Sequence, residues 1–166
     1  CIRDRTVTVY GVDDTLSDDN QAFSVTLGSV TSSDANYAGK NPDDVSVTNV
    51  DNETASITVS ALSGNTTEMG GTATFTVVLD SQPTSDVSIA VSSSDTSEAT
   101  ISPSSLTFDS SNYSTLQTVT VTGVDDFYDD DNVSYTITVD PSSSIASYNT
   151  MTSSTVTGSY IDNDTA

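Results

Sequence analysis

Apolar residues alternate with threonine and serine in short runs along most of the chain. The clearest run is Gly71–Leu79, in which Ala73, Phe75, Val77 and Leu79 fall on one face. A period of two residues predicts β-strands with one buried face. Threonine, valine and serine dominate, and no stretch shows the period of about 3.6 residues that is typical of an amphipathic helix. The sequence therefore predicts an all-β protein.

The alternating runs divide the chain into two parts. Three strands are predicted in residues 1–55, near 5–12, 21–28 and 44–50. Seven are predicted in residues 56–166, near 56–60, 71–79, 86–91, 105–108, 116–124, 132–139 and 154–161. Seven short strands at this spacing predict an Ig-like Greek-key β-sandwich, whereas three strands cannot close one.

The two parts also share sequence. Thr6–Asp14 matches Thr118–Asp126 at an offset of 118 − 6 = 112 residues, and Val50–Ala55 matches Ile161–Ala166 at 162 − 51 = 111 residues. We therefore expect tandem repeats of about 111 residues. Residues 1–55 would be the C-terminal half of one repeat, and residues 56–166 a complete seven-stranded repeat. The missing half is expected upstream in a longer parent chain, or else from a neighbouring molecule.

Charge narrows the possible partners. The chain has 24 acidic and 3 basic residues, and its net charge is −21. Such a surface repels nucleic acid and anionic lipid, and no apolar run approaches the ~18 residues of a membrane span. We therefore expect no nucleic-acid partner and no membrane insertion. Histidine is absent and the one cysteine is Cys1, so no pairing of a nucleophile with histidine supports an enzyme.

An acidic loop at Gly123–Asn132 carries five aspartates within seven positions. At a separation near 4 Å, each like-charged pair costs about 1 kcal/mol in water and about 4 kcal/mol at an effective dielectric of about 20. A fold that gathers these residues needs a counter-charge, and all three basic residues precede position 41. A hard divalent cation meets this need, and calcium accepts about six to eight oxygen ligands in flexible geometry.

The predicted topology brings further acids to this loop. A loop between two antiparallel strands and the end of the last strand can meet at one pole of a sandwich, which places Asp125 and Asp126 near Asp162 and Asp164. The alternative is that these are solvated turn aspartates, which make local hydrogen bonds in loops. Recurrence of the acids in both parts of the chain favours calcium. No EF-hand loop of the D-x-D-x-D-G type is present.

Three motifs in order carry a family resemblance: Glu68–Phe75, Gly123–Asp126 and Ile161–Asp164. Together they resemble a Calx-beta domain, and more closely the Calx-beta-like and Ig-like repeats strung in tandem through very large bacterial surface adhesins. The resemblance covers residues 56–166 and, through the internal similarity of the two parts, residues 1–55. It implies calcium at one end of the sandwich, beside the junction with the following module. Asn163 stands where that family often has another acid, which leaves the number of ions open.

The resemblance also implies a set of metal ligands. In residues 56–166 these are Glu68, Asp95, Asp125, Asp126, Asp130, Asp162 and Asp164. In residues 1–55 the corresponding acids are Asp13, Asp14, Asp18, Asp19, Asp51 and Glu53, with no counterpart of Glu68.

These observations predict a calcium-rigidified spacer from an extracellular or secreted bacterial surface adhesin. Its partners would be neighbouring repeats of the same chain, and it would hold a distal binding region away from the cell in cell adhesion or a biofilm. One alternative is a calcium-sensing regulatory domain of the Calx-beta type. Another is a module that binds carbohydrate or a host surface.

Overall fold

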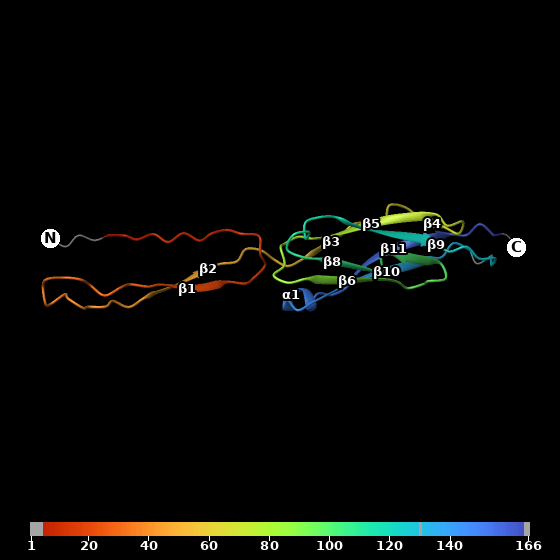
Figure 1. Ribbon diagram of the computed structural model, residues 1–166. Helices are drawn as coiled ribbons and strands as arrows, with labels where there is room; N and C mark the ends of the chain where they lie inside the picture. The colour runs from red at the N-terminus through yellow and green to blue at the C-terminus, as the bar shows by residue number, and fades with distance from the viewer. Residues whose placement is uncertain (1–4, 130, 165–166) are drawn as a thin grey trace.

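Two facing β-sheets form the second part of the molecule. The computed structural model describes residues 5–129 and 131–164 (Figure 1). One sheet has the strand order β3 (Ile57–Val59), β5 (Thr72–Leu79), β9 (Gln117–Gly123), β7 (Ala99–Ser102). The other has the order β4 (Thr66–Thr67), β11 (Ser154–Ile161), β10 (Ser134–Ser143), β6 (Val87–Ser93), β8 (Ser105–Phe108).

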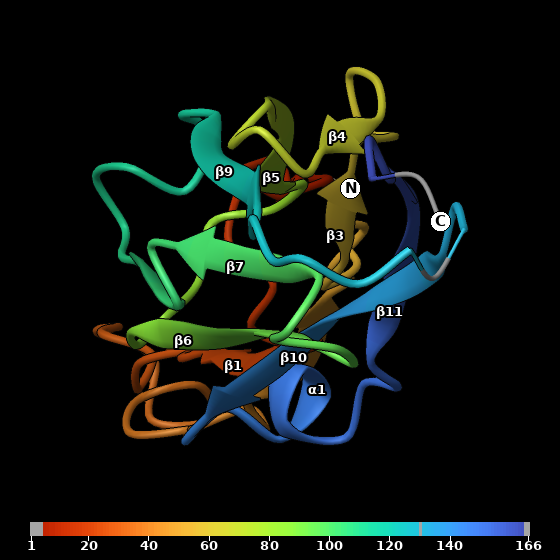
Figure 2. The ribbon, with the colours of Figure 1, turned by 90° about the vertical axis from the view of Figure 1, so that its right-hand side faces the viewer.

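This strand order is that of an immunoglobulin-like sandwich. Strands β3, β5, β9 and β7 take the places of A, B, E and D, and β6, β10 and β11 those of C, F and G. Figure 2 looks along the long axis and places β5, β7 and β9 in one layer and β6 and β10 in the other. The prediction of an all-β Ig-like sandwich is confirmed.

The core lies between the two sheets and follows the predicted alternation. Ala73, Phe75, Val77 and Leu79 of β5 are buried, and the residues between them are partly exposed. Burying one such side chain contributes roughly 1.5–3 kcal/mol for the larger aliphatic and aromatic residues. The facing strands add the other large buried side chains, among them Ile89, Phe108, Tyr135, Ile137, Tyr148 and Tyr160.

All seven strands predicted in residues 56–166 are present, but the described residues of the sandwich contain two more. Strand β4 has only two residues and forms by pairing with β11. Strand β7 has four residues and buries only Ala99 fully, so its alternation is weak in the sequence. The described residues also contain one short helix, α1 (Ala146–Asn149), which the sequence did not predict and which buries Tyr148 in the core.

Residues 5–54, here called the N-terminal unit, have an open structure. Strands β1 (Gln21–Val25) and β2 (Val45–Asn49) form an antiparallel pair, as predicted. The strand predicted near 5–12 is wrong, because residues 5–14 form no strand. The similar segment β9 pairs with β5 and β7 on its two edges, and the N-terminal unit contains no such neighbours. Extended sequence without a partner strand makes no ladder.

The two parts follow one another along an elongated molecule. In Figure 1 the N-terminal unit projects from one end of the sandwich, and the C-terminus lies at the other end. An isolated parallel bridge between Leu16 and Gln82 joins the two parts. The described residues contain no helix that is both long enough and apolar enough to span a bilayer.

Candidate metal centre

The parallel pairing of β4 with β11 positions Glu68, the most buried acid among the described residues. Thr66 lies beside Tyr160 and Thr67 beside Ile161, so both strands end at the same edge of the sheet. The next residue, Glu68, donates its backbone N–H to the Ile161 carbonyl at 3.1 Å. Acids that follow β11 therefore emerge next to Glu68, although about 95 residues separate them in sequence (163 − 68 = 95).

The Glu68 side chain is 1% exposed and is held by two backbone donors. Its Oε1 accepts the N–H of Asp126 at 3.3 Å, and its Oε2 accepts the N–H of Asn163 at 2.9 Å. Glu68 thus connects the loop after β9 to the segment after β11. A buried carboxylate held only by neutral donors is costly unless a positive charge lies nearby.

Glu68, Asp162 and Asp164 form a cluster in which one carboxylate oxygen of each lies within 4.8 Å of the others. The Oδ2 atom of Asp164 is buried and has no hydrogen-bond partner. Partial burial raises the pKa of Asp164 above its ordinary value, and the negative charges of neighbouring aspartates raise it further. These are Asp162, Asp125, Asp126 and Asp129, in decreasing order of effect.

The loop after β9 is fixed close to this cluster. A Cβ atom at Gly123 would lie 2.1 Å from the Thr67 carbonyl oxygen, so only glycine allows β9 to approach β4 here. The Tyr160 hydroxyl donates to the Val124 carbonyl, and Tyr128 N–H donates to Asp126 Oδ1 at 2.8 Å. The acidic loop therefore begins with a defined shape at the edge of the cluster.

Asp162 is held in place by backbone hydrogen bonds. Its Oδ1 accepts the N–H of Asp164 at 2.8 Å, and its Oδ2 accepts the N–H of Asp131 at 3.1 Å. Its own N–H donates to Asn132 Oδ1 at 3.1 Å. The acids that gather at this tip of the sandwich are here called the terminal pole. Its members are Glu68, Asp125, Asp126, Asp129, Asp131, Asp162 and Asp164.

A second group of acids lies in the N-terminal unit and is here called the junction pole. It lines a cavity of about 220 Å³ and consists of Asp13, Asp14, Asp18, Asp19, Asp51 and Glu53. Backbone N–H groups lower the pKa of Asp51, and that of Glu53 has the largest effect. Partial burial raises the pKa of Glu53, and a hydrogen bond with Asp51 and the charge of Asp13 add to this.

The two poles share the same local geometry. Asp19 and Asp131 both have φ = 63°, in the left-handed region that aspartate tolerates better than most residues. Asp51 Oδ2 accepts the Asp19 N–H at 2.7 Å, as Asp162 Oδ2 accepts the Asp131 N–H. Two further pairs of bonds correspond: Asp51 N–H to Asn20 and Asp162 N–H to Asn132, and Glu53 N–H to Asp51 and Asp164 N–H to Asp162.

One predicted ligand, Asp95, stands apart from these groups. Asp95 Oδ1 accepts the hydroxyl of Ser97 at 2.5 Å and its N–H at 3.0 Å, and these bonds lower the pKa of Asp95. Its carboxylate caps its own turn and does not join the cluster of Glu68, Asp162 and Asp164. Asp130 lies outside the described residues.

Three acids at or beside the terminal pole, Asp129, Asp131 and Glu98, were not among the predicted ligands. Asp129 acts on the Asp164 carboxylate through its charge, and Asp131 holds Asp162. Glu98 is 5% exposed, and its carbonyl accepts the Val124 N–H at 3.0 Å. The run of aspartates after β9 indicated Asp129 and Asp131. Glu98 had only a weak signal, as an isolated acid in a segment rich in serine and threonine.

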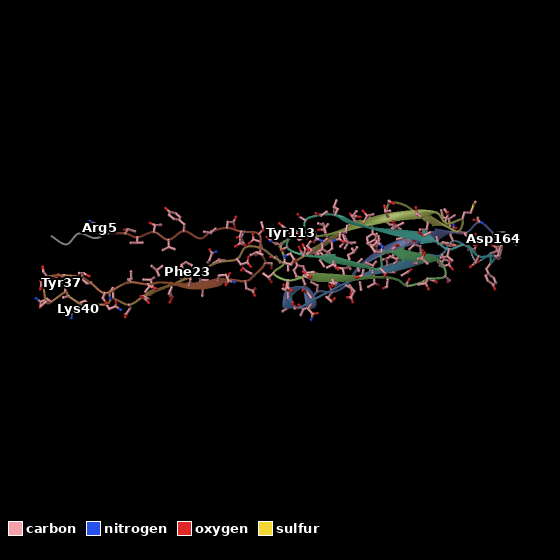
Figure 3. The ribbon with its side chains drawn as sticks, in the orientation of Figure 1. Arg5, Phe23, Tyr37, Lys40, Tyr113 and Asp164 are labelled. Atoms are coloured by element: carbon pink, nitrogen blue, oxygen red, sulfur yellow. The ribbon has the colours of Figure 1, made fainter. Side chains whose placement is uncertain are left out.

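The donor set at the terminal pole suits a hard divalent cation. It consists of carboxylate oxygens and includes one buried oxygen without a partner. Figure 3 places Arg5 and Lys40 in the N-terminal unit, at the end of the molecule opposite Asp164. The sandwich itself contains no lysine or arginine. Its own side chains therefore supply no cation to this cluster.

Comparisons with known proteins give no family. No protein-family model matches the chain, and no curated protein matches it. Several solved structures are similar at low identity. WR4, a C. elegans member of the MSP family, is 15% identical, with coverage of 64% of this chain and 97% of WR4 and a TM-score of 0.41.

Two further structures with low similarity come from an S-layer protein and a human protein. Domains 4 and 5 of the S-layer protein SbsC are 20% identical, with coverage of 88% of this chain and 77% of theirs and a TM-score of 0.38. The ASH / PapD-like domain 7 of human CEP192 is 13% identical, with coverage of 66% and 87% and a TM-score of 0.42. TM-scores this low support no argument about family or function.

Proposed function

We propose that this protein is a spacer segment of an elongated extracellular bacterial surface protein, an adhesin, in which calcium at the acidic poles holds successive sandwiches in line. One observation carries the proposal. Glu68, Asp162 and Asp164 converge at the tip of the sandwich, with a buried Asp164 oxygen that has no partner. Like charges gathered in this way are stable together only with a counter-charge.

Calcium fits this donor set better than other common metals do. Carboxylate oxygens on flexible loops match its loose coordination, whereas magnesium demands near-octahedral geometry and zinc prefers nitrogen and sulfur. When bound, the ion supplies the positive charge that offsets the carboxylates. We assign Glu68, Asp162 and Asp164 as ligands. Asp125, Asp126 and Asp130, from the loop after β9, are further candidates.

The chain's own residues would convert this binding into stiffness. Glu68 follows β4, Asp126 follows β9, and Asp162 follows β11, so drawing their side chains together ties three segments at one tip. At the junction pole, Asp51 and Glu53 occupy the connection between β2 and β3. Holding these two acids restrains the connection between the two parts, which would otherwise act as a hinge.

The shape of the molecule suits a spacer. The longest strand, β10, has ten residues, which at about 3.4 Å per residue span roughly 34 Å. Acidic poles lie at the junction and at the far tip, along the long axis seen in Figure 1. A row of such sandwiches would extend a distal binding region away from a surface by roughly this length per module.

We also propose that residues 1–55 are the C-terminal part of a preceding sandwich, in which residues 5–12 would join β1 and β2 as a strand once neighbouring strands are present. Apolar residues of this segment are exposed, while those 111 or 112 positions later are buried. Val7 is 81% exposed and Val119 is 0% exposed; Phe23 is 41% exposed and Tyr135 is 1% exposed. The same holds for Val9 and Val121, Leu27 and Val139, and Val45 and Val156. Strands like β3–β8 would cover this face.

A fusion tests the completion of the N-terminal unit. Because residue 113 corresponds to residue 1 (113 − 112 = 1), a second copy of residues 56–112 would be placed before Cys1. We expect slower hydrogen exchange in residues 5–14 and weaker binding of a hydrophobic dye. The control is a fused copy with Phe75→Ser and Val77→Ser. Equal exchange with and without the intact copy would contradict this domain assignment.

Calcium binding is tested by melting the full chain in calcium and in excess EDTA. A ligand at a hundredfold excess over its Kd contributes about 2.7 kcal/mol, which corresponds to a rise in Tm of roughly 10 °C. Binding in the millimolar range is expected of an extracellular spacer, and a micromolar Kd with a change of shape would favour the calcium sensor. Superimposable melting curves in calcium and in EDTA would refute the calcium proposal.

A further inference from the structure

The contact between the N-terminal unit and the sandwich is made by one loop on each side. Gln82 N–H donates to the Thr15 carbonyl at 2.8 Å, and Ser17 N–H donates to the Gln82 carbonyl at 3.2 Å. The Thr15 hydroxyl also donates to Gln82 Oε1 at 2.8 Å. These three bonds flank the parallel bridge between Leu16 and Gln82. The Gln82 loop follows β5, at the end of the sandwich opposite the terminal pole.

A similar loop exists at the terminal pole, where residues 127–129 form no bridge to another described segment. Residues 11–14 and residues 123–126 are both Gly-Val-Asp-Asp. In each loop the second aspartate accepts an N–H two residues on, from Leu16 and from Tyr128, at 2.8 Å in both cases. Phe127 and Tyr128 therefore stand where Thr15 and Leu16 stand at the junction.

These two aromatic residues are unusually open to solvent. Phe127 is 95% exposed and Tyr128 is 75% exposed, so two adjacent aromatic side chains present apolar surface to solvent at this tip. In the corresponding loop, Leu16 is half-buried against the Gln82 side of the sandwich. Aromatic side chains at these positions would bury more apolar area in the same contact than threonine and leucine do.

We infer that residues 127–129 form a docking edge for the Gln82 loop of another sandwich of this sequence, the one that follows in a longer chain. The Phe127 carbonyl would accept the N–H of that glutamine, and the Asp129 N–H would donate to its carbonyl, as Thr15 and Ser17 do at the junction. This inference rests on the tandem arrangement proposed above. The partner surface is the Gln82 loop, because the corresponding residues at the junction, 15–17, already pair with Gln82 in this chain.

Disulfide trapping in a tandem protein tests the docking edge. A second copy of residues 56–166 is appended after Ala166, in a Cys1→Ser background. Tyr128→Cys is combined with Gln82→Cys in the appended copy. Paired strands lie about 4.8 Å apart, within the Cα separation that a disulfide spans. Leu16→Cys with Gln82→Cys in the original chain is the positive control, and Met69→Cys, an exposed position after β4, is the negative control.

Mild oxidation should join Tyr128→Cys to the appended copy as fully as the positive control pair and leave Met69→Cys unjoined. A second readout uses Phe127→Trp, because the chain has no other tryptophan. Its emission should shift to shorter wavelength when the second sandwich is appended. Equal trapping at both positions, or an unshifted emission, overturns the docking edge.

The same measurements in calcium and in EDTA separate this inference from the calcium proposal. Trapping at Tyr128→Cys together with a Tm that ignores calcium would support the docking edge and remove the calcium proposal. A calcium-dependent Tm without trapping or emission shift would support the calcium proposal and remove the docking edge. A docking edge that forms only in calcium supports both.

Discussion

The substitution Glu68→Gln separates the role of the buried acid in folding from its role in binding calcium. Glu68 accepts two backbone N–H groups, one on each carboxylate oxygen. Glutamine keeps one acceptor, so its NH₂ group must face one of these donors. A buried donor without a partner costs about 1–3 kcal/mol. Removing the charge relieves repulsion within the cluster, so the two effects oppose each other when calcium is absent.

In calcium the two proteins should differ strongly. Loss of a ligand is expected to weaken binding by at least about a hundredfold, since even outer contacts to a metal site are worth about tenfold to a hundredfold. At a concentration that gives the unmodified chain about 2.7 kcal/mol, the variant would gain only about 0.4 kcal/mol. The difference of about 2.3 kcal/mol corresponds to roughly 8 °C in Tm.

The assay is thermal unfolding followed by the near-ultraviolet circular dichroism of tyrosine, because Tyr135, Tyr148 and Tyr160 are buried in the sandwich. Each protein is melted in calcium and in EDTA. Asp86→Asn is the matched control, since Asp86 is an exposed acid just before β6, at the opposite end of the sandwich. If Glu68→Gln gains as much Tm from calcium as the unmodified chain does, Glu68 is not a calcium ligand.

Two further substitutions test other parts of the structure. Gly123→Ala should lower the free energy of unfolding by about 1–3 kcal/mol in chelator and also reduce the rise in Tm with calcium, because the new Cβ would collide with the Thr67 carbonyl that precedes Glu68. Unchanged melting would contradict the close approach of β9 to β4. Gly64→Ala is the control, because a Cβ there meets no neighbour within 4 Å. Ser111→Ala removes the hydroxyl that contributes most to lowering the pKa of Asp109 below its ordinary 3.8. A lowered carboxyl pKa stabilises the fold at pH values above the ordinary pKa, and this stabilisation is lost as pH falls through the folded-state pKa. The variant should therefore melt lower than the unmodified chain at neutral pH, and the difference in Tm should shrink as pH falls below the ordinary 3.8. A difference that stays constant with pH, or the same effect from Ser110→Ala, would refute the assignment.

Several features of the protein follow from its sequence alone. The alternation of apolar and hydroxyl residues determines which positions are strands and which faces are buried, because side chains on a strand point to opposite sides. The prediction that Ala73, Phe75, Val77 and Leu79 face the core depends only on this geometry. The excess of acids and their grouping in the loops are likewise properties of the sequence, and they identified the pole that holds Asp162 and Asp164.

Other features depend on contacts that no local pattern encodes. Strand β4 exists because it pairs with β11, and that pairing brings Glu68 to Asp162 and Asp164. The resemblance implies Asp95 as a further ligand, and in the structure its carboxylate accepts a hydrogen bond from Ser97 within its own turn. The stretch near residues 5–12 has the alternation of a strand and forms none, since a β-ladder requires a second chain segment beside it. The sequence determines which residues can be buried or bind metal, and tertiary pairing decides which of them meet.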